Sequence, residues 1–304
     1  MLYRKKGQLF LCLLLCLTLS ACSDKESDNK DYPTEYKQSE AQTMENIKMP
    51  SHPESATFSD GAIALVDYSN MTQGYIQARL LGNVNQRVKL KVMKDGKKYY
   101  YDVSKLEYET FPLQMGDGTY SISILENTEG DDYAILSSQD IEVQLESDKI
   151  CYLYPNQTVN YNLESSIVNV SFDLVKGDKD DLTRIYHLYD YVIKTLKYDD
   201  AKAEASNDKY ILPDLEEALK TKKGICYDYA ALLAALCRIQ NIPAKVIVGD
   251  TDIEYHAWVE IYLEGKGWIN PTVYFKGQDW SLIDPTFAAT KAEYEGKYSE
   301  VYHY

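Results

Sequence analysis

The chain has 304 residues, of which 45% are hydrophobic, 26% charged and 12% aromatic, so a disordered or collagen-like protein is excluded and one large or two ordinary domains are expected. With 32 Lys and Arg against 47 Asp and Glu, the formal net charge is −15. An anionic surface repels a phosphate backbone, and we therefore expect no nucleic-acid partner.

The first residues are cationic and then apolar. Arg4, Lys5 and Lys6 precede an apolar run from Leu9 to Leu19. This run is too short for a comfortable membrane span, and the pattern predicts a secretory signal peptide over residues 1–21. An uncleaved anchor helix is the alternative interpretation.

The end of this segment, Leu19-Ser20-Ala21-Cys22, resembles the lipobox of bacterial lipoproteins. The resemblance implies that Cys22 becomes the lipidated first residue of the mature protein. More than one acyl chain gives stable anchoring, so the protein is expected to be extracytoplasmic and held to the outer face of the bacterial cell membrane. Cleavage removes three cations and no anions, which makes the mature chain −18.

Residues 22–57 are rich in Ser, Asp, Glu, Lys, Gln and Pro and contain almost no large apolar side chains. Such a segment cannot bury a core, and we expect a lipid-anchored flexible tether. The folded part of the chain is therefore expected to begin near residue 58.

Two of the six cysteines leave with the signal peptide, and Cys22 is the lipidation site. The remaining three are Cys151, Cys226 and Cys237, and an odd number implies at least one free thiol. Cys226 and Cys237 lie in one predicted helix, about 16 Å apart at ~1.5 Å per residue, so they cannot bond to each other. Either could pair only with Cys151 or stay reduced.

Residues 58–150 contain short runs in which apolar and polar residues alternate. Asp95-Gly96 and Asp117-Gly118 are turn dipeptides that close hairpins. Repeated strands without a helical stretch predict an antiparallel, immunoglobulin-like β-sandwich. No residue here stands out chemically, so a spacer or binding module is expected. The predicted strands are 62–68, 75–81, 87–94, 97–103, 119–125 and 141–145.

Residues 151–180 are expected to connect the sandwich to a domain over residues 181–304. Apolar residues at 182–196 recur on one helical face, and Asp180 or Asp181 supplies the N-terminal cap. The acidic residues at this cap lack the spacing of an EF-hand calcium loop.

A second short helix is predicted between Pro213 and Gly224, where Gly224 lets the backbone turn. A third helix follows over residues 226–238, with Cys226 at its start. The free N–H groups and the dipole at this end of a helix favour a thiolate over a thiol. Cys237 lies in the middle of the same helix, which is the position of an inert core cysteine.

Residues 245–249 and 255–263 alternate as strands, and His256 lies at the start of the second. A further short strand ends at Asp284, directly before a proline. A cysteine at a helix start, a histidine on a strand and a carboxylate on a neighbouring strand are the parts of a nucleophile, base and orienter arrangement.

Four ordered motifs run through this part of the chain, and together they are far more specific than any one alone. They are Gly-Ile-Cys-Tyr-Asp-Tyr-Ala at 224–230, Arg-Ile-Gln-Asn-Ile-Pro-Ala at 238–244, His-Ala-Trp-Val-Glu at 256–260 and Asp-Pro-Thr at 284–286. They resemble the transglutaminase-like superfamily of papain-fold cysteine enzymes. The resemblance implies an α+β protein, with a papain-like core of helices on an antiparallel sheet preceded by the all-β sandwich.

The family pattern assigns the nucleophile to Cys226, the base to His256 and the third member to Asp284. Asn270 also precedes Pro-Thr and remains an alternative orienter, but Asp284 has the whole Trp-x-x-x-Asp-Pro-Thr pattern. The Cys226 N–H is the natural first oxyanion donor, and the second donor is unassigned.

No Gly-rich phosphate loop and no paired metal-ligand motif occurs in the sequence, so neither an organic cofactor nor a metal is expected. Single, widely spaced Cys, His and Asp residues make a poor zinc signature.

These observations predict a cysteine-dependent acyl-transfer enzyme acting on peptide, protein or cell-wall amides. A Cys226 thioester opened by water gives a peptidase or amidase, and one opened by an amine gives a cross-link. The resemblance to bacterial proteins of this type favours hydrolysis. A non-catalytic cell-surface binding module with the same fold is the alternative hypothesis, and the oligomeric state is left open.

Overall fold

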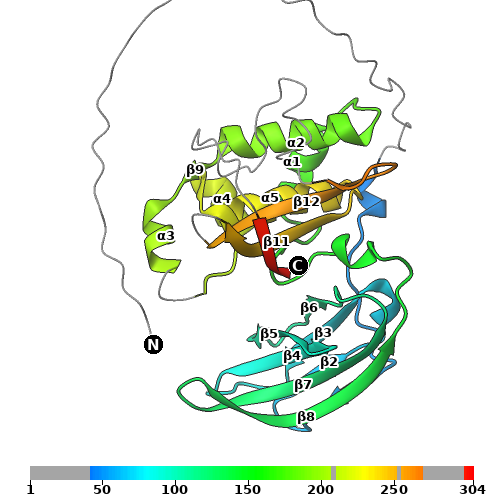
Figure 1. The fold of residues 1–304 in the computed structure, drawn as a ribbon, viewed down its shortest axis with the longest axis vertical. Coiled ribbons are helices and arrows are strands. Elements are labelled where there is room, and N and C mark those ends of the chain that lie inside the picture. The colour runs from blue at the N-terminus through cyan, green and yellow to red at the C-terminus, as the bar shows by residue number, and fades with distance from the viewer. Residues whose placement is uncertain (1–41, 207–209, 252–254, 270–297) are drawn as a thin grey trace, which may run out of the picture. The chain divides into compact units, whose positions relative to one another are not determined.

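The structure is a computed structural model that describes residues 42–206, 210–251, 255–269 and 298–304 (Figure 1). These residues all lie within one compact unit, Lys37–Tyr304. Among the helices of these ranges, none combines the length and the apolarity needed to cross a membrane. Three short 3-10 helices are η1 (Met44–Asn46), η2 (Met71–Gln73) and η3 (Ile150–Tyr152).

The first part of the fold consists of two four-stranded antiparallel sheets, with strand orders β1-β2-β3-β6 and β5-β4-β7-β8. Buried side chains of both sheets form a single core, for example Val66 and Ile76 with Leu90 and Ile122. The antiparallel sandwich is therefore observed, and its immunoglobulin-like character stays a prediction. The strands are β1 (Thr57–Ser59), β2 (Ala64–Asp67), β3 (Tyr75–Leu80), β4 (Val88–Lys94), β5 (Lys97–Val103), β6 (Glu109–Pro112), β7 (Gly118–Glu129) and β8 (Asp132–Val143).

The hairpin of β4 and β5 shows how the alternating sequence builds this core. Leu90 lies opposite Tyr101 and Val92 opposite Tyr99, and all four side chains are buried. The residues between them on β5 are exposed. Asp95 and Gly96 take φ values of 49° and 82°, the left-handed conformation that a two-residue hairpin turn requires. Alternation and turn chemistry thus define the same register.

The alternation of apolar and polar residues does not predict every strand. β1 and β6 have three and four residues, and β6 is buried on both sides, so neither shows a clear period. β8 begins at Asp132, well before the predicted 141, and most of its residues up to 140 are exposed. The pairing with β7 along this length, rather than a buried face, gives β8 its full extent.

The second part of the fold is mixed α/β, as predicted. Its antiparallel sheet has the order β13-β12-β11-β14, and β9 and β10 form a small parallel pair. The helices are α1 (Ser166–Leu174), α2 (Asp181–Thr195), α3 (Asp200–Ser206), α4 (Leu215–Thr221) and α5 (Cys226–Ile239). The strands are β9 (Lys197–Tyr198), β10 (Lys223–Gly224), β11 (Ala244–Thr251), β12 (Tyr255–Leu263), β13 (Gly267–Ile269) and β14 (Tyr298–His303).

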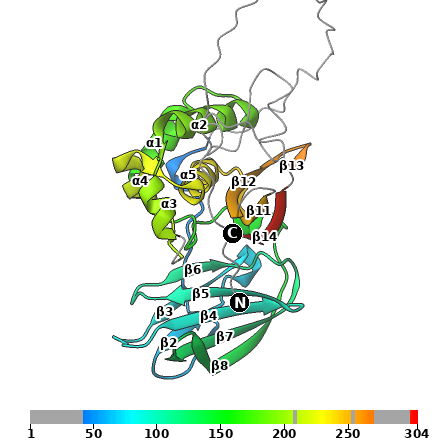
Figure 2. The same ribbon diagram turned by 60° about the vertical axis from the view of Figure 1, so that its left-hand side comes forward.

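Helix α5 is the centre of this part. It packs against β11 and β12 on one side and against α1, α2 and α4 on the other (Figure 2). The predicted N-terminal cap of α2 is confirmed, since the Asp180 carboxylate accepts the Thr183 N–H at 2.9 Å. Helix α1 was not predicted, and its Ser171 hydroxyl donates to the Leu236 carbonyl of α5 at 3.0 Å.

Arg238, near the end of α5, is fully buried. Its Nε and Nη2 donate to the backbone oxygen of Ala244 at 3.0 and 2.8 Å, and its Nη1 donates to that of Tyr154 at 2.8 Å. Nη2 also donates to the backbone oxygen of Tyr304 at 2.8 Å. Burial lowers the pKa of Arg238 to about 10, so the side chain remains charged at neutral pH. One guanidinium thus joins the start of β11 and two segments distant in sequence to α5.

We expect Arg238→Met to lower the free energy of unfolding by about 3–5 kcal/mol, because buried backbone oxygens lose their donors. Urea denaturation followed by circular dichroism measures this change. The control is Arg87→Met, whose side chain is 56% exposed and pairs with an exposed Asp131. The control should change stability by no more than about 0.5 kcal/mol. An equal effect of both substitutions would contradict the role of Arg238.

Candidate active site

Cys226 is the first residue of α5, as the sequence predicts. The preceding Ile225 is the N-cap, with φ −99° and ψ 177°. Cys226 is partly exposed, whereas the residues that follow it in α5, from Tyr227 to Ile239, are all buried. Its N–H lies in the first helical turn, whose N–H groups the helix itself does not use. The thiol therefore lies at the positive, accessible end of an otherwise enclosed helix.

Asp228 holds this end of α5 in place. Its side chain is buried, and Oδ2 accepts the Ile225 N–H at 2.9 Å. Oδ1 lies 2.7 Å from the Lys202 Nζ of α3. The first contact is the half of a capping box in which the N3 side chain accepts the N-cap N–H. The second contact places a positive charge beside a carboxylate that is buried away from water. An ion pair therefore connects α3 to the turn that carries Cys226.

The turn before α5 differs from the prediction. Lys222, and not Gly224, adopts the left-handed conformation after α4, with φ 55°. Gly224 is required for a different reason, because a Cβ at this position would lie 2.7 Å from the Cβ of Asp228. The glycine makes room for the carboxylate that caps α5.

Tyr227, directly after Cys226, is also fixed by side-chain contacts. Its hydroxyl lies 3.1 Å from the Thr158 hydroxyl and 2.6 Å from the Tyr210 hydroxyl. Tyr227 is only 7% exposed. Segments before α1 and before α4 therefore meet at the residue next to the thiol.

His256 lies on β12, the strand that packs against α5, and it is 2% exposed. Its partner across the antiparallel pair with β11 is Gly249. On the other side of β11 the pairing with β14 shifts register between Val248 and Gly249, and a Cβ at Gly249 would overlap the Ser299 carbonyl oxygen. The residue directly opposite His256 on β11 therefore has no side chain.

Three of the predicted site residues lie outside the described residues. They are the orienter Asp284, its alternative Asn270 and the lipidation site Cys22. The structure places Cys226 and His256 on elements that pack together, and the roles of all these residues stay predictions.

The two other thiols of the described ranges are internal. Cys151 is 2% exposed and Cys237 is fully buried, and neither they nor Cys226 form a disulfide. Burial raises the pKa of Cys151 to about 12, and it raises the pKa of Cys237 well above its ordinary value. The prediction that Cys237 is an inert core residue agrees with this burial.

The contacts of Asp228 and Lys202 were not predicted from the sequence. The signal for Asp228 was its place three residues after the N-cap, where an acidic side chain can return to the N-cap N–H. Lys202 carries no comparable signal, since it lies on a separate helix and meets Asp228 only in the folded chain.

Residues 168–285 match the family model described as the Transglutaminase-like superfamily. The matched segment includes Cys226, His256 and Asp284. A search of curated proteins finds no match.

Solved structures also resemble the chain. A proposed cysteine protease from Cytophaga hutchinsonii is 18% identical over 76% of this chain and 91% of that chain, with a TM-score of 0.36. Red sea bream transglutaminase is 13% identical over 75% of this chain and 56% of that chain, with a TM-score of 0.30. A proposed protease from Parabacteroides distasonis is 14% identical over 59% of this chain and 36% of that chain, with a TM-score of 0.26. At this level the comparisons carry no argument about activity.

Iodoacetamide at neutral pH should modify Cys226 in the folded chain and leave Cys151 and Cys237 unmodified. Of the three cysteines that the structure describes, only Cys226 is partly exposed, and burial disfavours the reactive thiolate at the other two positions. Peptide mass mapping before and after unfolding in urea measures the difference. Alkylation of Cys237 at the rate of Cys226 in the folded chain would show that the described burial is wrong.

Lys202→Met should destabilise the fold by about 1–3 kcal/mol, because it leaves the buried Asp228 carboxylate without its cation. The double variant Lys202→Met with Asp228→Asn should recover part of the loss, since the amide still accepts the Ile225 N–H without burying a charge. Urea denaturation of the single and double variants gives the coupling energy. Lys220→Met, at a 78% exposed side chain, is the control, and strictly additive effects would argue against the pair.

Proposed function

We propose that the chain is a cysteine-dependent acyl-transfer enzyme with Cys226 as nucleophile. The observation that carries the proposal is the position of Cys226, an accessible thiol at the first residue of a buried helix within the segment that matches the transglutaminase-like family. First-turn N–H groups and the helix dipole stabilise negative charge both on the sulfur and on an oxyanion beside it.

In the proposed reaction the Cys226 thiolate attacks the carbonyl carbon of an amide and forms a C–S bond. The C–N bond then breaks, and the leaving nitrogen takes a proton from the His256 imidazolium. Water next attacks the thioester and gives a proton to His256, the C–S bond breaks, and the thiolate is restored. Asp284 would hold the imidazole tautomer and stabilise its cation.

We propose hydrolysis of peptide, protein or cell-wall amides rather than cross-linking as the main outcome. Cys226 is partly exposed, so water reaches the position at which the thioester would form. An amine can react at the same position, and the ratio of the two products depends on how well the acyl-enzyme is shielded from water.

We also propose that this activity is extracytoplasmic and lipid-anchored through Cys22. The support is the cationic start, the apolar run and the Leu-Ser-Ala-Cys sequence before the polar segment. The substrate would then be met at the outer face of the cell membrane.

Cys226→Ala should lower the release of ammonia or amine from glutamine-containing peptides by at least about 10³-fold, because the covalent intermediate can no longer form. The assay measures this release beside the incorporation of a fluorescent primary amine into casein. Circular dichroism confirms that the variant is folded. An unchanged rate would overturn the proposal and leave the non-catalytic binding module in its place.

Two further variants in the same assay test the third member of the site. Asp284→Ala should lower activity strongly and Asn270→Ala should not, since only Asp284 has the full motif. The reverse result would assign the orienting role to Asn270.

Cys22→Ser should release the protein from the membrane fraction of a bacterial host, because the acyl chains can no longer be attached. Metabolic labelling with a radioactive fatty acid, followed by fractionation, measures both effects. Cys151→Ser is the matched control, since Cys151 is buried in the folded chain. Equal labelling of Cys22→Ser and the unmodified sequence would exclude lipidation at this residue.

A further inference from the structure

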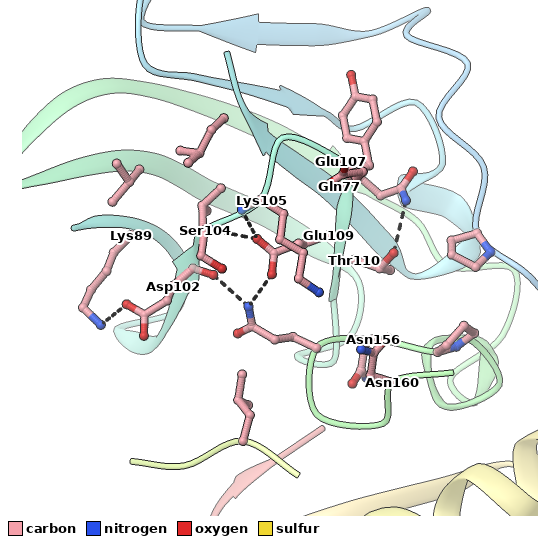
Figure 3. Close-up of a pocket in the computed structure, with 18 of the residues that line it drawn as sticks. Gln77, Lys89, Asp102, Ser104, Lys105, Glu107, Glu109, Thr110, Asn156 and Asn160 are labelled. Atoms are coloured by element: carbon pink, nitrogen blue, oxygen red, sulfur yellow. Dashed lines mark hydrogen bonds and ion pairs between the residues drawn. The ribbon is translucent and has the colours of Figure 1, made fainter. Parts of the chain in front are cut away.

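A groove of about 920 Å³ lies against the sandwich (Figure 3), and neither Cys226 nor His256 lines it. Its walls come from residues 49–52, from β3 to β6 with the loops between them, and from two later segments, 155–162 and 212–213. The volume is within the range of ligand-binding clefts. The sequence analysis assigned no chemistry to this part of the chain, because the contributing residues are far apart in sequence.

The groove contains a preorganised polar centre formed by Glu109 and Gln157. Glu109 is 8% exposed, and its Oε2 accepts the N–H groups of Ser104 and Lys105 at 2.8 and 3.2 Å (Figure 3). Gln157 Nε2 donates to Glu109 Oε1 at 3.2 Å and to the Asp102 carbonyl at 2.7 Å. Both amide hydrogens of Gln157 are therefore committed, and its carbonyl oxygen is left as an acceptor.

Two further amides in the walls have hydrogen-bonding capacity that other described residues do not satisfy. Asn156 Oδ1 accepts the N–H groups of Thr158 and Val159, both at 2.9 Å, which fixes Nδ2 as a donor. Gln77 Nε2 donates to the Thr110 hydroxyl at 3.1 Å. Asn156 Nδ2 and Gln77 Oε1 are buried and have no partner within the described ranges. A ligand that both donates and accepts hydrogen bonds matches this pair.

The charges of the groove balance, although the chain as a whole is strongly anionic. Three cations and three carboxylates line it, and Lys89 and Asp102 pair with each other at 2.7 Å. The lining cations are Arg87, Lys89 and Lys105, and the lining carboxylates are Asp102, Glu107 and Glu109. A site of this kind favours an uncharged ligand, since it has no excess of positive or negative side chains to attract a charged one.

Apolar and aromatic side chains also line the groove. Leu80, Val84 and Leu212 contribute aliphatic surface. His52 is exposed and stacks on Tyr108 with ring centroids 4.7 Å apart. A flat ring at the edge of a polar groove suits a ligand that has hydroxyl groups around its rim and C–H groups on its faces.

An extended peptide is a poorer fit to the same groove. The outer edge of β6 would be the place for an added strand, but Gln157 N–H already donates to the Thr110 carbonyl there at 3.1 Å. Peptide recognition by strand addition depends on free backbone groups of this kind.

We propose that this groove binds a neutral oligosaccharide, alone or as part of a polymer. Sugar hydroxyl groups both donate and accept, which matches the amides and carboxylates of the walls, and sugar rings have apolar faces for His52. The inference goes beyond the proposed function and does not need Cys226. The groove segment nevertheless reaches the nucleophile helix, since Thr158 lies 3.1 Å from the Tyr227 hydroxyl.

The test is calorimetric titration of the full chain carrying Cys226→Ala, so that no turnover interferes. The probes are cellotetraose, maltotetraose and the tetramer of N-acetylglucosamine, with tetragalacturonate and a neutral tetrapeptide as comparisons. At least one neutral tetrasaccharide should bind more tightly than both comparison ligands. His52→Ala and Gln157→Ala should each weaken that binding by about fivefold or more.

Matched controls lie outside the groove on the same sandwich. Tyr100→Ala removes an exposed ring from β5, and Gln139→Ala removes an exposed amide from β8, and neither should change the affinity. Circular dichroism checks the fold of each variant. The proposal would be overturned if no neutral tetrasaccharide bound, or if the peptide or tetragalacturonate bound more tightly. It would also be overturned if both groove variants bound the tetrasaccharide as tightly as the chain without a groove substitution. None of these results depends on whether Cys226 is catalytic.

Discussion

The position of α5, the helix that begins at Cys226, depends on a buried charge that has no access to water. Arg238 donates to backbone oxygens of Tyr154, Ala244 and Tyr304, so the segment before α1, the start of β11 and the end of β14 converge on α5. A buried guanidinium without such acceptors would be strongly unfavourable, and the convergence of these segments is therefore obligatory. The sheet that carries His256 is held against α5 by the same set of contacts.

Helix α5 is enclosed because the side chains in its middle turns are small. Ala230, Ala231, Ala234 and Ala235 are all fully buried, and they allow helices on one side and strands on the other to approach closely. Only the first residue of the helix, Cys226, emerges from this packing. An accessible thiol at one end and close packing along the remainder are two results of the same sequence.

The features that the sequence predicted well are those encoded locally. The alternation of β4 and β5, the Asp180 cap and the start of α5 at Cys226 all follow from residues within a few positions of one another. The features that it did not predict depend on distant partners. The Lys202 contact with Asp228 joins separate helices, and the groove brings Gln77 and Gln157 into one lining. β8 was predicted too short because its exposed residues carry no period.

The position of β14 has a consequence for the order in which the chain can fold. β11 pairs with β12 almost immediately in the sequence, but its other edge is completed only by Tyr298–His303. This edge of β11 therefore stays unpaired in any folding intermediate in which Tyr298–His303 has not yet added to the sheet. Unpaired edges promote association between chains, and contacts of such long sequence separation slow folding. An intermediate that lacks β14 thus exposes a strand edge to which another chain can pair.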